Sequence, residues 1–156
     1  LQQGRERAQS AGVADSLEYI RGDAARLPFP DNHFDTVFAM RFFHLMDDPE
    51  PFVTELSRVS SDQVLFDTFN RYSGRSLYTW ALPMGSRLYS ENEVQALLDS
   101  ADLDLVASEH DWVFPYGMYR ELPNTLASGF RKLDNGLGKT PLGHPLASVS
   151  YWDTRV

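Results

Sequence analysis

The apolar and polar positions along this chain follow two periods, one typical of strands and the other typical of helices. Short runs that alternate apolar and polar residues, or that are almost wholly apolar, predict strands. Such runs lie at Leu17–Arg21, Asp35–Met40, Val64–Phe69, Leu103–His110 and Ala147–Arg155. The Asp35–Met40 run is apolar at nearly every position, as expected for a strand that is buried on both faces of a parallel sheet.

Two helices are predicted in the first part of the chain. Good helix formers run from Gln2 to Ala11, and Gly12 is a natural residue to follow the C-cap. Asp48 is predicted to cap a second helix whose first position is Pro49, because proline is well tolerated there.

Two more helices are predicted after the strand at Val64–Phe69. Ser90 and Glu93 have the spacing of a capping box and open an amphipathic helix. A last helix is expected at Asn124–Leu133, within a long stretch rich in proline, glycine and tyrosine. The segment Arg71–Leu88 is predicted to be a connection, although it is unusually rich in large apolar residues.

The order of these elements predicts the fold class. Helices alternate with strands as far as Ala101, which is the pattern of an α/β layered fold. The last two strands are joined without a clear helical crossover of the β-α-β kind, so we expect an antiparallel pair at the C-terminal edge of the sheet.

Composition narrows the classes of function. The 156 residues are enough for one domain with its own core, and the formal charge of −8 disfavours DNA or RNA as a partner. No run approaches the roughly 20 apolar residues that cross a bilayer. The chain has no cysteine, which excludes a disulfide framework and fits a cytoplasmic protein. Its acidity and its preference for arginine over lysine suggest either a salt-adapted (halophilic) or a GC-rich source.

The segment around Asp23 is the first candidate binding site. Asp23 follows the predicted strand Leu17–Arg21, at the end where open α/β sheets bind ligands. Its carboxylate is suited to accept a hydrogen bond from an exocyclic amine such as adenine N6, and the N–H of Ala24 to donate to a ring nitrogen. The alternative for Asp23 is a capping or Asx-turn carboxylate. Leu27, in the rigid loop Leu27–Pro30, packs either on a purine face or over a sheet edge.

The segment after the predicted strand Asp35–Met40 is the second candidate site. Arg41 is suited to bind a carboxylate, with a surface ion pair as the alternative. Phe42 and Phe43 are candidate walls of a pocket. His44 is the best-placed residue for proton abstraction, because imidazole changes charge near neutral pH, and a packing role is its alternative.

Aromatic and cationic residues in the two long connections form a third candidate set. Such groups above a sheet suit a largely apolar organic substrate with an anionic handle, whereas the alternative is a small satellite core. The set comprises Arg71, Tyr72, Trp80, Tyr116, Tyr119 and Arg120. The remaining histidines lack ligand spacing, so no metal site is predicted.

Several short motifs together resemble the class I S-adenosylmethionine (SAM)-dependent methyltransferases. The similarity is greatest to the small-molecule group that includes the ubiquinone and menaquinone biosynthesis enzymes, and it covers about residues 1–110. The motifs are Gly22-Asp23-Ala24, Leu27-Pro28-Phe29-Pro30, Phe34-Asp35 with Val37, His44 before Asp48-Pro49, Tyr89-Ser90, and Ala101-Asp102-Leu103.

This resemblance implies SAM as cofactor and a small organic molecule as methyl acceptor. In the family the residue at Asp23 bonds the adenine amine, and the neighbour at Ala24 binds the ring through its backbone. The segment matching Met40 and Arg41 lines the methionine end of SAM. Residues matching Phe42 to His44 approach the transferred methyl, which makes His44 the candidate general base where the acceptor arrives protonated.

Two elements of the family pattern have no counterpart in this sequence. They are the glycine-rich loop after the first strand and the acidic residue that holds the ribose hydroxyls. Both belong to strands that the family places between Leu17–Arg21 and Asp35–Met40 in a Rossmann-like sheet. We therefore expect residues 1–156 to be the C-terminal portion of a single methyltransferase domain that lacks its first strands. Such a chain is expected to bind SAM weakly or not at all, and to form a homodimer or exchange segments across its exposed edges.

Two rival functions stay open. A nicotinamide-dependent oxidoreductase would need a Gly-x-Gly-x-x-Gly loop, and the sequence contains none. SAM has no phosphates, so an acidic chain fits it better. A non-catalytic binding or scaffold domain that keeps the fold without turnover is the second rival.

Overall fold

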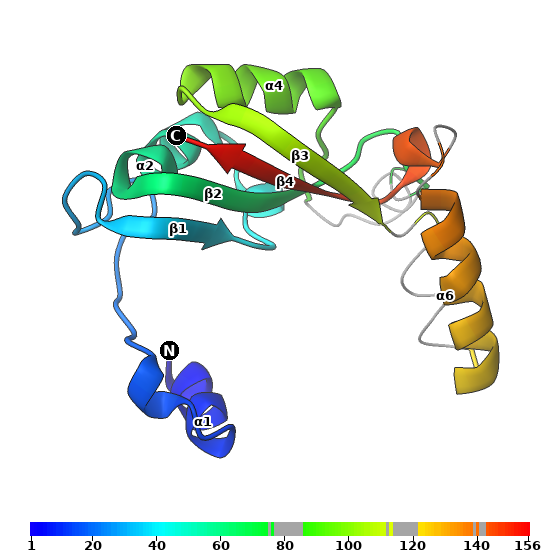
Figure 1. Cartoon of the computed structure of the whole chain (residues 1–156), viewed down its shortest axis with the longest axis horizontal. Helices are drawn as coiled ribbons and strands as arrows, with labels where there is room; N and C mark the ends of the chain where they lie inside the picture. The colour runs from blue at the N-terminus through cyan, green and yellow to red at the C-terminus, as the bar shows by residue number, and fades with distance from the viewer. Residues whose placement is uncertain (75, 77–85, 112, 114–121, 139, 141–142) are drawn as a thin grey trace.

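The computed structural model describes residues 1–74, 76, 86–111, 113, 122–138, 140 and 143–156 (Figure 1). The helices are α1 (Gln2–Ser10), α2 (Glu50–Val59), α4 (Glu91–Ser100) and α6 (Asn124–Gly138), and the strands are β1 (Phe34–Ala39), β2 (Ser60–Phe69), β3 (Asp104–Asp111) and β4 (Val149–Arg155). Three short 3-10 turns lie at Ala14–Ser16, Phe43–Leu45 and His144–Leu146. The predicted α/β class is confirmed.

The four strands form one mixed sheet in the order β1-β2-β4-β3. β1 pairs with β2 in parallel, and α2 provides the crossover between them. β4 lies antiparallel to both β2 and β3. The antiparallel pair at the C-terminal edge is therefore confirmed, with the last strand of the chain inserted between β2 and β3.

The core lies between the sheet and the helices α2 and α4. These helices contact each other, α2 contacts β1 and β2, and α4 contacts β3. Val53 of α2 and Leu98 of α4 are completely buried, as is Phe66 of β2. Burial of such side chains contributes roughly 1.5–3 kcal/mol each. The carboxyl ends of β1 and β2 are thereby held on a packed scaffold.

The predicted strand at Leu17–Arg21 is wrong. These residues form no strand, and Leu17 and Ile20 are about half exposed. A strand needs a neighbour to accept and donate its backbone hydrogen bonds, and no strand of the described residues lies beside this segment. Figure 1 shows an extended segment between α1 and the sheet, with α1 well separated from the sheet. The hydroxyl of Tyr19 instead donates to the carbonyl of Gly4 in α1, at 2.9 Å.

Helix boundaries agree with the predicted capping chemistry in two places and differ in one. Gly12 follows the C-cap of α1 with a φ of 69°, and Ser90 and Glu93 form the predicted capping box of α4. Asp48 does not cap α2, because the N-cap is Pro49 and the helix begins at Glu50. Asp48 therefore lies one residue too early to reach the first free amides of the helix.

The edge formed by β1 is the open edge of the parallel part of the sheet. β1 has a paired strand on one side only, and Phe38 is 66% exposed. In the part of the chain that the structure describes, no helix is long and apolar enough to cross a membrane.

Candidate functional site

Asp23 lies in a tight turn that precedes β1. Its carbonyl accepts the N–H of Arg26 at 3.0 Å, and its Oδ1 accepts the N–H of Ala25 at 3.0 Å. This is an Asx turn, the alternative that the sequence left open. The side chain is exposed, and Ala24 beside it is half-buried. Because a carboxylate can accept about four hydrogen bonds, the turn leaves acceptor capacity for a ligand amine.

Leu27 joins this turn to helix α2. Its N–H donates to Oε1 of Glu55 at 2.6 Å, and its half-buried side chain packs against the core. Glu55 is itself only 9% exposed. The buried carboxylate of Glu55 therefore holds the loop on α2, although Glu55 was not among the residues predicted from the sequence.

Arg58, one turn along α2, contacts the same loop through its whole guanidinium group. Its Nε and Nη2 donate to Glu55 at 2.8 and 2.7 Å. Nη2 also donates to the carbonyls of Leu27 and Phe29 at 3.3 and 3.0 Å, and Nη1 donates to Oδ1 of Asp31 at 2.6 Å. One arginine thus binds a carboxylate on its own helix and three groups of the loop.

These bonds change the acidity of both partners. The hydrogen bond from Arg58 lowers the pKa of Glu55 against the opposing effect of burial, and the N–H of Leu27 lowers it further. The same carboxylate, followed by that of Asp31, raises the pKa of Arg58. The Glu55 carboxylate is therefore ionised and the Arg58 guanidinium is protonated near neutral pH.

Arg41 follows β1 in an unusual backbone conformation. Its φ is 57°, in the left-handed region that residues other than glycine, asparagine and aspartate seldom adopt. Its N–H donates to Oδ1 of Asp67 on β2, and its Nε lies 3.4 Å from Oδ2 of the same carboxylate. The Asp67 side chain is 2% exposed, whereas that of Arg41 is 51% exposed. Asp67 thus fixes the backbone of Arg41 while the guanidinium stays accessible.

Phe69 brings Arg41 and His44 to one place. The guanidinium carbon of Arg41 lies 5.2 Å from the centre of the Phe69 ring. The His44 ring lies 4.6 Å from the same ring, centre to centre. Two residues that the sequence reading placed at the carboxyl end of β1 are therefore neighbours across an aromatic side chain of β2, and Met40 beside them is 44% exposed.

The predicted pocket walls differ from each other in burial. Phe43 is wholly buried and packs on Phe66, with the ring centres 5.0 Å apart, so its side chain belongs to the core. Phe42 is half-buried and packs edge-on against Phe52. The hydroxyl of Tyr89 donates to the carbonyl of Phe43 at 2.9 Å, and burial raises the pKa of Tyr89 to about 12. Tyr89 therefore remains a neutral donor that fixes the turn before His44.

The residues predicted on the long connections are only partly described. Arg71 donates to the carbonyl of Leu88 at 3.1 Å and to Oε1 of Glu93 at 2.7 Å, so it ties its connection to the start of α4. Tyr72 is 66% exposed. The other members of the predicted set lie outside the described residues: Trp80, Tyr116, Tyr119 and Arg120.

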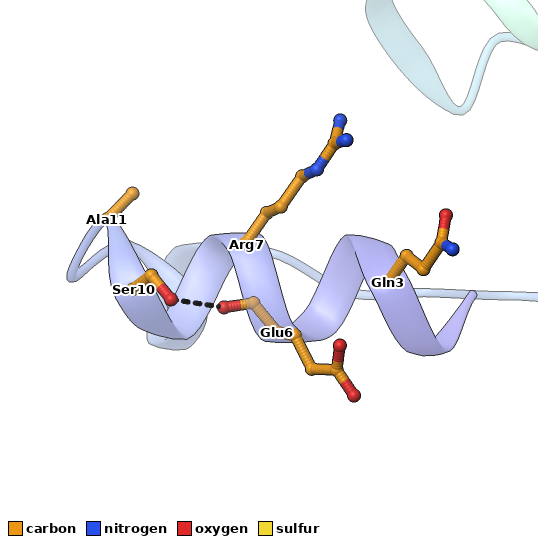
Figure 2. Close-up of a pocket in the computed structure, with 5 residues that line it drawn as sticks. All are labelled: Gln3, Glu6, Arg7, Ser10 and Ala11. Atoms are coloured by element: carbon orange, nitrogen blue, oxygen red, sulfur yellow. Dashed lines mark hydrogen bonds between the residues drawn. The ribbon is translucent and has the colours of Figure 1, made fainter.

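A shallow hollow lies elsewhere, along one side of α1. It is lined by residues of that helix and its C-cap, namely Gln3, Glu6, Arg7, Ser10 and Ala11 (Figure 2). None of the predicted site residues borders it. Among the described residues, no group of three or more His, Asp or Glu side chains is arranged to hold a metal ion.

Three residues of the site were missed by sequence reasoning: Glu55, Arg58 and Asp67. Asp67 carried a signal, since a carboxylate within the apolar run Val64–Phe69 is rarely buried without a partner. Glu55 and Arg58 have the i,i+3 spacing of a helical ion pair, but that spacing alone does not identify the loop they bind.

Comparison with known proteins identifies related sequences and folds. The family profile described as "Methyltransferase domain" matches residues 1–66. A ubiquinone/menaquinone biosynthesis C-methyltransferase UbiE from Ectopseudomonas oleovorans is 54% identical over 37 residues, which are 24% of this chain and 22% of that protein.

Two solved structures have a similar fold. The geranyl diphosphate C-methyltransferase of Streptomyces coelicolor A3(2), solved with Mg²⁺, geranyl diphosphate and S-adenosyl-L-homocysteine, has a TM-score of 0.65 and 13% identity, over 97% of this chain and 58% of that one. The (4+2)-cyclase SpnF has a TM-score of 0.64 and 17% identity, over 96% of this chain and 59% of that one. The chain thus spans less than two thirds of each of these relatives.

Proposed function

We propose that this chain belongs to the class I SAM-dependent methyltransferase family and that it is the C-terminal portion of a domain that methylates a small organic molecule. The observation that carries the proposal is that two candidate half-sites flank β1 in the chain. The Asp23–Leu27 turn offers the donor and acceptor pair for adenine, and Arg41 and His44 lie together at the carboxyl end of β1.

The residues present fit the chemistry of SAM. An exposed carboxylate at Asp23 suits the adenine amine, and the Ala24 N–H and the Leu27 side chain suit the ring. Met40 and the accessible guanidinium of Arg41 suit the methionine end, because arginine binds carboxylates through charge-assisted hydrogen bonds. SAM, when bound, supplies a methyl group that its sulfonium already activates.

The role of the protein is then mainly to align the acceptor with that methyl group. His44 is the proposed general base, needed where the acceptor arrives protonated, and Tyr116 is the second candidate. The ring contact with Phe69 limits the orientations of His44. The aromatic side chains of Phe42, which is half-buried, and of Phe69, which contacts the His44 ring, suit a largely apolar acceptor.

The acceptor itself is proposed only as a class. The residues proposed to contact it are Arg71, Tyr72, Tyr116 and Tyr119. Their cationic and phenolic groups would bind an anionic or hydroxyl group of the acceptor. Because the guanidinium of Arg71 is already bound to Glu93, we rank Tyr72 above it as a contact residue.

The substitution His44→Ala tests the proposed catalytic role. It is made in the intact protein, meaning the complete methyltransferase domain of which this chain is proposed to be a portion. We expect turnover to fall by about a hundredfold, the usual contribution of a general base, while SAM affinity stays within a few-fold. Transfer of labelled methyl from SAM and a parallel binding titration measure the two effects. An unchanged rate would remove His44 from the mechanism.

A second candidate function keeps the fold without methyl transfer. The similarity to a cyclase favours it, since a shared fold does not specify one chemistry. Tight binding of SAM or S-adenosylhomocysteine by the intact protein, with no transfer to any of a panel of small acceptors, would support this candidate. Methyl transfer to one of them would exclude it.

A further inference from the structure

We propose that Glu55 and Arg58 of α2 are positioning residues for the adenine half-site, the Asp23–Leu27 turn. They bind the loop that follows the turn and so attach the turn to α2. This inference rests on the proposed function in one respect only, the assignment of the Asp23–Leu27 turn to adenine. The attachment of the turn to α2 is a property of the structure itself.

The loop between the turn and β1 is attached to α2 by hydrogen bonds. Its bonds to α2 are the N–H of Leu27 on Glu55, the Leu27 and Phe29 carbonyls on Arg58, and the Asp31 carboxylate on Arg58. The carbonyl of Arg58 also accepts the N–H of Asn32, at 2.9 Å. Two residues of one helix thus bind the whole length of the loop between the turn and β1.

The segment that precedes the turn makes no comparable hydrogen bond to the sheet in the described residues. The segment Leu17–Arg21 is not part of the sheet, and its hydrogen bond through Tyr19 goes to α1 rather than to the core. Within Asp23–Arg26 the bonds are internal to the turn. Among the described residues, the hydrogen bond from the Leu27 N–H to Glu55 is therefore the one next to the turn that joins it to α2, and Phe29 further along the loop packs on Phe34 of β1.

The chemistry of Glu55 and Arg58 suits this attachment. Glu55 is buried, and its negative charge is stabilised by Arg58 and by the N–H of Leu27. A planar guanidinium presents five donors in a fixed fork, so it binds the carboxylates and the loop carbonyls at the same time. A lysine at this position would supply charge without that geometry. The arrangement is thus specific to arginine.

The first part of the test measures the loop in the 156-residue chain. Amide hydrogen exchange is compared in the wild type, in Arg58→Lys and in Glu55→Gln, with Arg155→Lys as the matched control. Arg155 pairs with Asp62 and Asp153 at the far end of β4 and does not contact the loop. We expect the Leu27 amide to exchange about tenfold faster in Arg58→Lys and to be accelerated less in Glu55→Gln, with β2 and β4 unchanged in both.

Glu55→Gln is the milder variant, because its amide oxygen can still accept the Leu27 N–H while the charge is lost. Equal exchange at Leu27 in the wild type and Arg58→Lys would overturn the attachment. Equally faster exchange in the loop and the sheet would also overturn it, since Arg58 would then stabilise the whole fold.

The second part of the test measures SAM affinity and kcat in the intact protein. We expect Arg58→Lys to weaken SAM binding by about tenfold while kcat at saturating SAM stays within about twofold. The reason is that Glu55 and Arg58 position the SAM-binding turn and do not contact the reacting groups. Arg155→Lys should leave both unchanged. Unaltered SAM affinity in an Arg58→Lys protein whose loop exchanges faster would overturn the positioning role.

The two proposals fail in different ways. If the intact wild type binds no SAM, the proposed function is wrong and the loop has no adenine to position, whatever the exchange rates. If the wild type binds SAM and the variants bind it equally well, the proposed function stands and only the positioning role of Glu55 and Arg58 is wrong.

Discussion

At the scale of single residues, the site is defined by buried carboxylates that hold backbone groups in place. Asp67 accepts the N–H of Arg41 in a left-handed conformation, and Glu55 accepts the N–H of Leu27. Non-glycine residues in such conformations cost about 1–3 kcal/mol and persist where the surroundings fix them. Both acceptors thus stabilise local geometry next to residues proposed to bind SAM.

Replacement of Asp67 tests this at the carboxyl end of β1. Asp67→Ala leaves the Arg41 N–H without its acceptor, and we expect it to lower the free energy of unfolding by about 1–3 kcal/mol. Urea denaturation of the 156-residue chain measures the change. Asp62→Ala is the control, because Asp62 is exposed and forms only a surface ion pair, which contributes under about 1 kcal/mol. Similar losses in the two variants would contradict the role of Asp67.

The lowered pKa of Glu55 predicts a dependence of stability on pH. Because the folded pKa lies below the ordinary value of 4.5, the carboxylate stabilises the fold above that value. This contribution is lost as the pH falls through the lowered folded pKa. The difference in unfolding free energy between the wild type and Glu55→Gln should therefore shrink as the pH falls below about 4.5. Urea titrations at a series of pH values measure it, and a difference that does not vary with pH would refute the prediction.

Residue roles were predictable only where they depend on nearby sequence. The turn at Asp23 follows from Asx chemistry within two residues. By contrast, Asp67 and Arg41 lie 26 positions apart, and Leu27 and Glu55 lie 28 positions apart. Local patterns carry no information about such pairs, because folding alone brings their atoms together. The binding roles of Asp23, Arg41 and His44 remain predictions.

At the scale of elements, helices with capping residues and strands with strong patterns were predicted well. The capping box at Ser90 and the strand β2 are examples, the latter with a longer N-terminal end than predicted. Leu17–Arg21 is the exception. Its alternation is as clear as that of β3, but a strand forms only where another strand supplies hydrogen-bond partners. Periodicity describes which face is apolar and not whether a neighbour exists.

The capping box of α4 gives a test at this scale. The Ser90 Oγ accepts the N–H of Glu93, and the Glu93 carboxylate accepts the N–H of Ser90 at 2.8 Å. We expect Ser90→Ala to destabilise the chain by about 1 kcal/mol. Ser100→Ala, at the exposed C-terminal end of the same helix, should change stability by less than about 0.5 kcal/mol. Thermal unfolding followed by circular dichroism compares them, and equal shifts would argue against the cap.

At the scale of the whole molecule, β1 and β3 are the two edge strands of the sheet, and β2 and β4 lie between them. The position of β4 between β2 and β3 depends on long-range bonds, such as Trp152 Nε1 to Thr68 Oγ1 at 2.9 Å. The polar sequence of β4 gave little sign of this burial. At the opposite side, β1 has an unpaired edge with Phe38 exposed, and the Asp23–Leu27 turn that is proposed to bind adenine precedes β1 in the chain. We therefore propose that this chain supplies only part of the cofactor site.

Isothermal titration of SAM into the 156-residue chain and into the intact protein tests this account most directly. We predict micromolar binding by the intact protein and binding at least about a hundredfold weaker, or undetectable, by the chain alone, because the turn and Arg41 supply only part of the contacts. No binding of SAM by the intact protein would contradict the proposed function. Micromolar binding by the chain alone would contradict the claim that it carries only half of the site.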